Sequence, residues 1–177
     1  MSDKIPFLPA NLHEPADTVA AIRARRGGEL LLLDRMLLHS PPLALGWNAL
    51  LDAVRSRLTL QPRLRELVIC AVGVLNGAEY EIDQHAGPFR QAGGTDRQLQ
   101  ALRDWDEALG DATLFDATER AVLQLAKVMT RDVRVPEQTL AAVRVALGSD
   151  RQVVELVGVI ATYNMVSRFL VALGVEP

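Results

Sequence analysis

The sequence predicts an all-α fold, an irregular bundle of about nine helices joined by short links. Two observations support this prediction. Leu, Ala and Val dominate the chain while aromatic residues make up only 5% of it, and this balance favours helix packing over β-sandwich packing. Helix-capping and helix-breaking residues also recur along the chain, and no segment has the alternation of a convincing strand.

The N-terminal part predicts an arm followed by three helices. Residues 1–15 contain three prolines and no hydrophobic period, so we expect an extended arm there and one helical domain over 16–177. A helix over 17–26 ends at Gly27-Gly28, and an apolar helix over 29–39 stops before Pro41-Pro42. A third helix over 43–58 carries one apolar stripe, formed by Leu43, Trp47, Leu50, Leu51, Val54 and Leu58.

The central part predicts two helices joined at a break. Pro62 suits the first turn of a helix that runs to about Leu75, and Asn76-Gly77 interrupts the pattern. The second helix begins near Glu79 and ends at Gly93-Gly94. Pro88 lies inside it and is expected to bend or shorten it.

The C-terminal part contains several sequence patterns that are typical of helix N-termini. Residues 95–98 and 149–152 are capping boxes, and 116–119 is a similar signal with Asp as the cap. Pro136 opens a helix that closes at Gly148. The last helix runs to Leu173, with Gly174 as its C-cap residue.

Charge and cysteine content restrict the function classes. The net charge is −3 and the chain has one cysteine, so neither a nucleic-acid-binding patch nor an intramolecular disulfide is expected. The three histidines are scattered without metal-ligand spacing, and no Gly-rich phosphate loop is present, so no metal and no cofactor are expected. The longest apolar run, 67–75, is too short to cross a bilayer, and 1–15 lacks a signal-peptide core, which predicts a cytoplasmic protein without membrane contact.

The polar residues of 65–93 are the strongest candidates for chemistry. Glu66 opens an almost wholly apolar helix, and Ala78, Glu81 and His85 share one face of the next helix. A carboxylate and an imidazole four residues apart can share a hydrogen bond, and burial would perturb their pKa values as acid–base catalysis requires. The alternative is an ordinary surface pair, with Glu66 serving only the helix dipole.

This stretch resembles the carboxymuconolactone decarboxylase family, which includes the alkylhydroperoxidase D enzymes. The matching residues are Arg65-Glu66-Leu67, Asn76-Gly77, Glu79-Tyr80-Glu81, His85 and Ala92-Gly93. The run 163–170 also resembles the last helix of the family, and the likeness is clear over about residues 40–105 and 150–175. The resemblance implies a helical bundle of the alkylhydroperoxidase D-like type that assembles into homo-oligomers, either trimers or hexamers.

The chain departs from the peroxidase branch of that family at both thiol positions. In that branch a Cys-x-x-Cys precedes the histidine by four residues, and a glutamate lies twelve residues before the first cysteine. Glu66 and His85 match, but Ala78 and Glu81 stand where the cysteines would be. Cys70 lies on an apolar helix and is expected to be an inert core thiol, so dithiol peroxidase activity is not expected.

The resemblance to the decarboxylase branch implies acid–base chemistry on a small acidic lactone or keto acid. His85 would donate or accept the proton, Glu81 would orient it, and Glu66 would be the second carboxylate. Tyr163 and Arg168 are candidate substrate-binding residues, with Arg168 as the anchor of a substrate carboxylate. A thiol-independent hydrolase or isomerase, a non-catalytic oligomeric binding protein and a peroxidase-family member without thiol activity remain alternatives.

Two structural expectations follow. Glu66, Glu81 and His85 should converge on one pocket, with direct contact between Glu66 and His85 only if the two helices are staggered, and otherwise a bridge through Glu81 or water. The apolar surface of 29–39 and 43–58 exceeds what one face of each helix can bury, so other subunits should cover the surplus.

Overall fold

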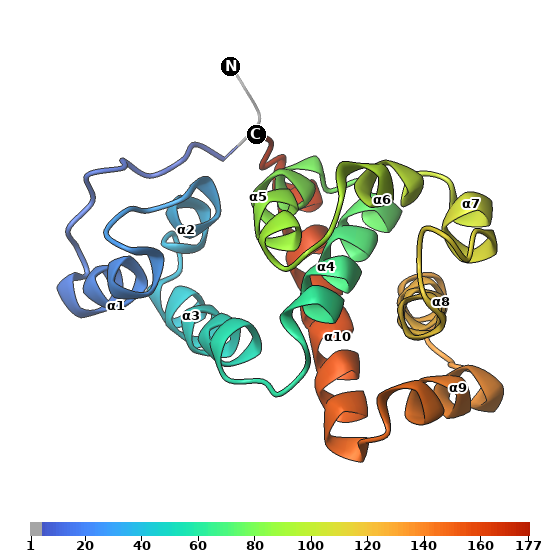
Figure 1. Cartoon of the computed structure of the whole chain (residues 1–177). Coiled ribbons are helices and arrows are strands. Elements are labelled where there is room, and N and C mark those ends of the chain that lie inside the picture. Colours follow the sequence, from blue (N-terminus) through green and yellow to red (C-terminus); the bar gives the residue numbers. More distant parts are fainter. Residues whose placement is uncertain (1–4) are drawn as a thin grey trace. The chain divides into compact units, whose positions relative to one another are not determined.

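The computed structural model describes residues 5–177, which form ten helices and no strand (Figure 1). The prediction of an all-α fold is confirmed. The predicted arm begins in residues 1–4, which lie outside the described residues. The described remainder of the arm is non-helical until α1 begins at Ala16.

The helices group into two compact units, each of which is described by itself. The first contains the chain up to Leu58 together with Leu173–Val175, and the second contains Thr59–Ala172 together with Glu176–Pro177. The expectation of one domain over 16–177 stays a prediction.

The first unit contains α1 (Ala16–Arg26), α2 (Leu32–Leu37) and α3 (Pro41–Ser56). Helix α2 is shorter than predicted. Asp34, in the first turn of the helix, caps it: its Oδ2 accepts a hydrogen bond from the backbone N–H of Leu31 at 3.0 Å. This bond fixes the start of the helix after Leu31. Arg26 neutralises the same buried carboxylate at 3.0 Å. Pro41 opens α3 two residues earlier than predicted, since a proline loses no hydrogen bond in the first turn.

The second unit contains the remaining helices and the central part of the sequence. These are α4 (Pro62–Asn76), α5 (Glu79–Gln91), α6 (Asp96–Ala101), α7 (Trp105–Gly110), α8 (Ala117–Arg131), α9 (Glu137–Leu147) and α10 (Asp150–Leu173). The sequence pattern did not predict α7, a helix of six residues. Its cap, Asp104, accepts hydrogen bonds from the N–H groups of Asp106 and Glu107. The capping boxes at Thr95 and Asp116 are confirmed.

Helix α4 is the core of the second unit, and residues 67–72 have no exposed surface. It packs against α5 and α8, and the chain reverses between α4 and α5 at Gly77, whose φ of 66° favours glycine. Helix α10 runs parallel to α4, since Glu155 binds the N–H groups of Thr59 and Leu60 before α4, and Asn164 binds Asn76 at its end. Figure 1 shows α10 beside α4.

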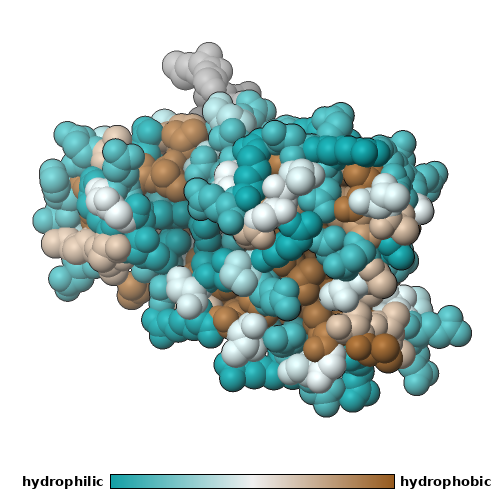
Figure 2. Space-filling model, in the orientation of Figure 1, coloured by the Kyte–Doolittle hydropathy of each residue, from teal (hydrophilic) through white to brown (hydrophobic). Residues whose placement is uncertain are grey.

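Hydrophobic side chains also reach the surface, where Figure 2 shows brown residues among a larger number of teal ones. Leu43, Leu45 and Leu50 of α3 are 47%, 50% and 40% exposed. Helix α10 is long and apolar enough to cross a membrane by length and composition alone, and half of its apolar window is buried within the protein. The expected cover of the α3 leucines by other subunits stays a prediction.

Candidate active site

The hairpin of α4 and α5 brings the predicted acid–base residues together. His85 Nδ1 lies 2.7 Å from Glu66 Oε2. The exposed fractions are 2% for Glu66, 2% for Glu81 and 5% for His85, so all three residues are buried. The contact between Glu66 and His85 is therefore direct, and the alternative of a solvated surface pair is wrong.

Glu66 uses both carboxylate oxygens within the protein. Oε1 accepts from Arg65 Nε at 3.1 Å, and Oε2 faces the imidazole. Since a carboxylate only accepts hydrogen bonds, Nδ1 of His85 carries the hydrogen and donates it to Glu66. This is the arrangement in which a carboxylate fixes the tautomer of a histidine.

The role expected for Glu81 is wrong, because Glu66 and not Glu81 orients His85. Neither oxygen of the Glu81 carboxyl has a hydrogen-bond partner within residues 5–177. Burial raises the pKa of Glu81 well above its ordinary value, so this side chain stays neutral where an exposed glutamate is ionised. The site therefore holds two carboxyl groups in opposite environments.

The close approach of α4 and α5 at this point depends on Gly73. A Cβ atom at Gly73 would lie 3.0 Å from Ile82 Cγ1 and 3.6 Å from Glu81 Oε2. A side chain at this position would force Ile82 to shift by a few tenths of an ångström, because 3.0 Å is shorter than ordinary carbon–carbon contact. Because residue 73 has no side chain, the Glu81 carboxyl can lie directly against α4.

The structure places the two candidate substrate-binding residues differently. The Tyr163 ring of α10 meets the His85 ring edge-on, with centroids 5.0 Å apart at 89°, and it is 1% exposed. Arg168 is exposed, and its Nη1 donates to Asn164 Oδ1 at 2.6 Å and to the Asn164 carbonyl at 3.0 Å. Tyr163 belongs to the site, whereas the contacts of Arg168 lie on its own helix.

Cys70 lies near these groups without being available for chemistry. It has no exposed surface, and burial, helped by the charges of Glu66 and Glu81, raises the pKa of its thiol to about 12. A thiolate is the nucleophile in thiol chemistry, so this cysteine is inert near neutral pH.

A largely buried polar network joins α4, α8 and α10, and the sequence pattern did not predict it. Asn76 Nδ2 donates to Asn164 Oδ1 at 3.1 Å and to Ser167 Oγ at 2.7 Å, and Asn164 Nδ2 donates to Thr130 Oγ1 at 3.0 Å. These bonds fix the end of α4 to α8 and α10. The available signal was the pair Asn164 and Ser167, two polar residues three positions apart in the apolar final helix.

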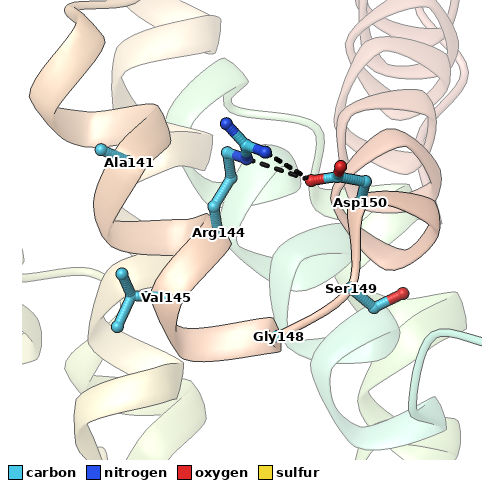
Figure 3. Close-up of a pocket in the computed structure, with 6 residues that line it drawn as sticks. All are labelled: Ala141, Arg144, Val145, Gly148, Ser149 and Asp150. Atoms are coloured by element: carbon cyan, nitrogen blue, oxygen red, sulfur yellow. Dashed lines mark hydrogen bonds and ion pairs between the residues drawn. The ribbon is translucent and has the colours of Figure 1, made fainter.

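One concave surface of the second unit lies away from Glu66, Glu81 and His85. A depression of about 500 Å³ lies at the corner between α9 and α10 (Figure 3). Arg144 reaches across it toward Asp150, whose Oδ1 lies 2.9 Å from Arg144 Nη2. The charges that line this surface are therefore already paired, and we place the candidate site at His85.

Comparisons with known proteins agree with this fold. The sequence profile of the Carboxymuconolactone decarboxylase family matches residues 41–128, a range that contains Glu66, Glu81 and His85. No curated protein matches the chain significantly.

Several solved structures are similar over nearly the whole chain. An uncharacterized peroxidase-related protein from Silicibacter sp. TM1040 has a TM-score of 0.79 at 20% identity, covering 100% of this chain and 93% of that one. A peroxidase-related protein from Ralstonia eutropha JMP134, described as an alkylhydroperoxidase AhpD core, has a TM-score of 0.78 at 18% identity, covering 98% and 91%.

A putative antioxidant defence protein AhpD from Agrobacterium tumefaciens has a TM-score of 0.71 at 21% identity, covering 80% of this chain and 94% of that one. At these identities the likeness shows the fold. The single cysteine of this chain excludes the Cys-x-x-Cys motif.

Proposed function

Because this chain belongs to the carboxymuconolactone decarboxylase family, in a branch without the Cys-x-x-Cys motif, we propose that Glu66, Glu81 and His85 form its active site. The proposed reaction is acid–base decarboxylation, or related lyase chemistry, on a small acidic lactone or keto acid. The observation that carries the proposal is the direct contact between the buried Glu66 carboxylate and the buried His85 imidazole. Titratable groups gathered out of water are typical of catalytic sites.

The geometry suits the proton transfer that decarboxylation requires. Loss of CO2 leaves a carbanion or enolate, which must receive a proton before the product can leave. His85 would supply it from Nε2, while Glu66 at 2.7 Å from Nδ1 stabilises the imidazolium form and holds the ring in place. These side chains perform such a transfer without a redox or electrophilic cofactor.

Burial of the site favours an enzyme over the alternative of a non-catalytic binding protein. A binding protein that had lost the chemistry would gain from solvating or replacing the ion pair, because buried ionic groups contribute little net stability. His85 is instead 5% exposed and packed against Tyr163. The dithiol peroxidase alternative lacks both cysteines.

The test is CO2 release from a panel of small β-keto acids and carboxylated unsaturated lactones. We expect turnover by the wild-type protein and a loss of roughly 10²–10⁴-fold in kcat for His85→Gln. His13→Gln is the matched control, because His13 is exposed and far along the chain from the site. Equal activity of the two variants, or no turnover of any panel member by the wild type, contradicts the proposal.

A further inference from the structure

Glu81 is a group whose position the fold itself does not explain. It is 2% exposed, and neither carboxyl oxygen has a hydrogen-bond partner among the described residues. Burying a polar group without partners costs roughly 1–3 kcal/mol, and natural proteins rarely keep such groups unless they serve a reaction, a ligand or a water. Leu or Met at this position would fill the same space between α4 and α5 without that cost.

The neighbouring carboxyl shows the opposite pattern. Glu66 has a cation on one oxygen, Arg65 at 3.1 Å, and the imidazole on the other at 2.7 Å. These two partners favour the charged form of Glu66, whereas the Glu81 carboxyl is buried beside Gly73 without a hydrogen-bond partner among the described residues. When the environments of two carboxyl groups in one site move their pKa values apart, one group can act as an acid while the other stays a charged partner.

A neutral carboxyl selects a particular ligand chemistry. Its O–H is a hydrogen-bond and proton donor, and without a negative charge it does not repel an anionic substrate. The matching group on the ligand is an oxygen that gains electron density as the reaction proceeds. A ketone or lactone carbonyl oxygen has this property when a carboxylate leaves from the carbon next to that carbonyl, or from its vinylogous position.

Resting on the function proposed above, we infer that Glu81 is a catalytic acid that protonates the carbonyl oxygen of the substrate, and that the substrate class is therefore β-keto acids and their vinylogous lactone equivalents. Acids whose carbonyl is isolated from the leaving carboxylate are excluded. Glu81 and His85 then act on different atoms of the substrate, with Glu81 at oxygen and His85 at carbon.

In the inferred step the substrate is a β-keto carboxylate. The bond between the α-carbon and the carboxylate carbon breaks, CO2 leaves, and the electron pair forms the carbon–carbon double bond of an enol. The carbonyl oxygen takes the proton of Glu81, which becomes a carboxylate. Protonated His85 then gives its Nε2 proton to the α-carbon, the enol O–H proton returns to Glu81, and His85 recovers a proton from solvent.

The first experiment measures CO2 release from acetoacetate, a β-keto acid, and from 4-oxopentanoate, whose carbonyl is one carbon farther away. We expect turnover of acetoacetate only, and a fall of roughly 10²-fold or more in kcat with little change in KM for Glu81→Gln, since an amide donates a hydrogen bond but no proton. If His85→Gln abolishes turnover and Glu81→Gln does not, the inference about Glu81 is overturned while the proposed function stands.

A second experiment does not depend on turnover. Infrared difference spectra of the wild type against Glu81→Leu isolate the stretching band of the neutral Glu81 carboxyl, and pentane-2,4-dione serves as a β-dicarbonyl probe that cannot lose CO2. Binding of the dione should shift this band to lower frequency as the O–H donates to a carbonyl oxygen. An unchanged band at saturating dione overturns the inference. A shifted band in a protein that decarboxylates no panel member supports it and overturns only the proposed function.

Discussion

Substitution of Glu81 by Gln should change how the stability of the protein depends on pH. The folded-state pKa of Glu81 is raised by burial, while the unfolded chain titrates near the ordinary value of about 4.3. Between these two values the folded state holds a proton that the unfolded state has lost, so the free energy of unfolding falls as pH rises through that window. Glutamine has the same shape and no titration, so the variant lacks this fall.

The size of the effect follows from one proton. Linkage gives a slope of about 1.4 kcal/mol per pH unit when the two states differ by one bound proton. The wild type and Glu81→Gln should have nearly equal stability near pH 4, since both side chains are then neutral and unpaired. Above pH 5, the free energy of unfolding of Glu81→Gln should exceed that of the wild type by an amount that grows with that slope. Glu66 on α4 is present in both proteins, and the Cys70 thiol, with a pKa of about 12, does not titrate in this range.

Urea unfolding at half-unit steps from pH 4 to pH 8 measures the difference directly. The matched control is Glu79→Gln on the same helix, where a hydrogen bond from Arg103 lowers the pKa of an exposed carboxyl. That control should show the opposite sign, because the contribution of Glu79 is present above the unfolded pKa and is lost as pH falls. Parallel curves for the wild type and Glu81→Gln over the whole range would refute a neutral, buried Glu81.

Four further predictions concern packing, the ion pair, redox chemistry and assembly. Gly73→Ala should cost roughly 1–3 kcal/mol in urea unfolding because its Cβ would meet Ile82 at 3.0 Å, whereas Gly87→Ala, with open space around it, should not destabilise; equal effects would contradict the close approach of α4 and α5. A double-mutant cycle of Glu66→Gln and His85→Gln should give a coupling energy of roughly 1–3 kcal/mol, and additive effects would argue against the direct buried pair. The protein should not reduce peroxide with a dithiol donor, and turnover that disappears when its single cysteine becomes serine would show the opposite. Light scattering at micromolar concentration should give a homo-oligomer, a trimer or hexamer, since α3 exposes three leucines; a monomer would leave those leucines unexplained.

Helix boundaries could be predicted wherever a local signal acts alone. The capping boxes at Thr95 and Asp116 and the glycine ends at Gly27 and Gly148 lie where the sequence placed them, because caps act within one turn. The second helix was predicted too long, since its start depends on a carboxylate that reaches back to Leu31. Helix α7 was missed because six residues carry too little periodicity to reveal a helix.

In the candidate site too, features set within one helix could be predicted, whereas contacts between helices could not. Helical spacing placed Glu81 and His85 on one face, and the family spacing added Glu66. The hydrogen-bond partner of His85 was assigned wrongly, because the i, i+4 rule considers one helix, whereas the stagger of α4 against α5 brings Glu66 within 2.7 Å. The bonds of Asn76 to α10 join residues 88 and 91 positions apart, and no local pattern specifies them.

In the proposed function, Glu81 stands where the resemblance to the peroxidase branch puts a thiol, and this exchange would let one scaffold serve two chemistries. Burial disfavours the charged form of a thiol and of a carboxyl alike, so either group can occupy the buried position one helical turn before His85. In the proposed reaction His85 still transfers a proton, here to a substrate carbon, and Glu66 still orients the imidazole. A sulfur atom adds a nucleophile and a redox couple, whereas a carboxyl adds only a proton. In the proposed reaction, the oxygen of Glu81 thus determines that this chain performs proton transfer, and the same burial that suits a neutral thiol makes its carboxyl an acid.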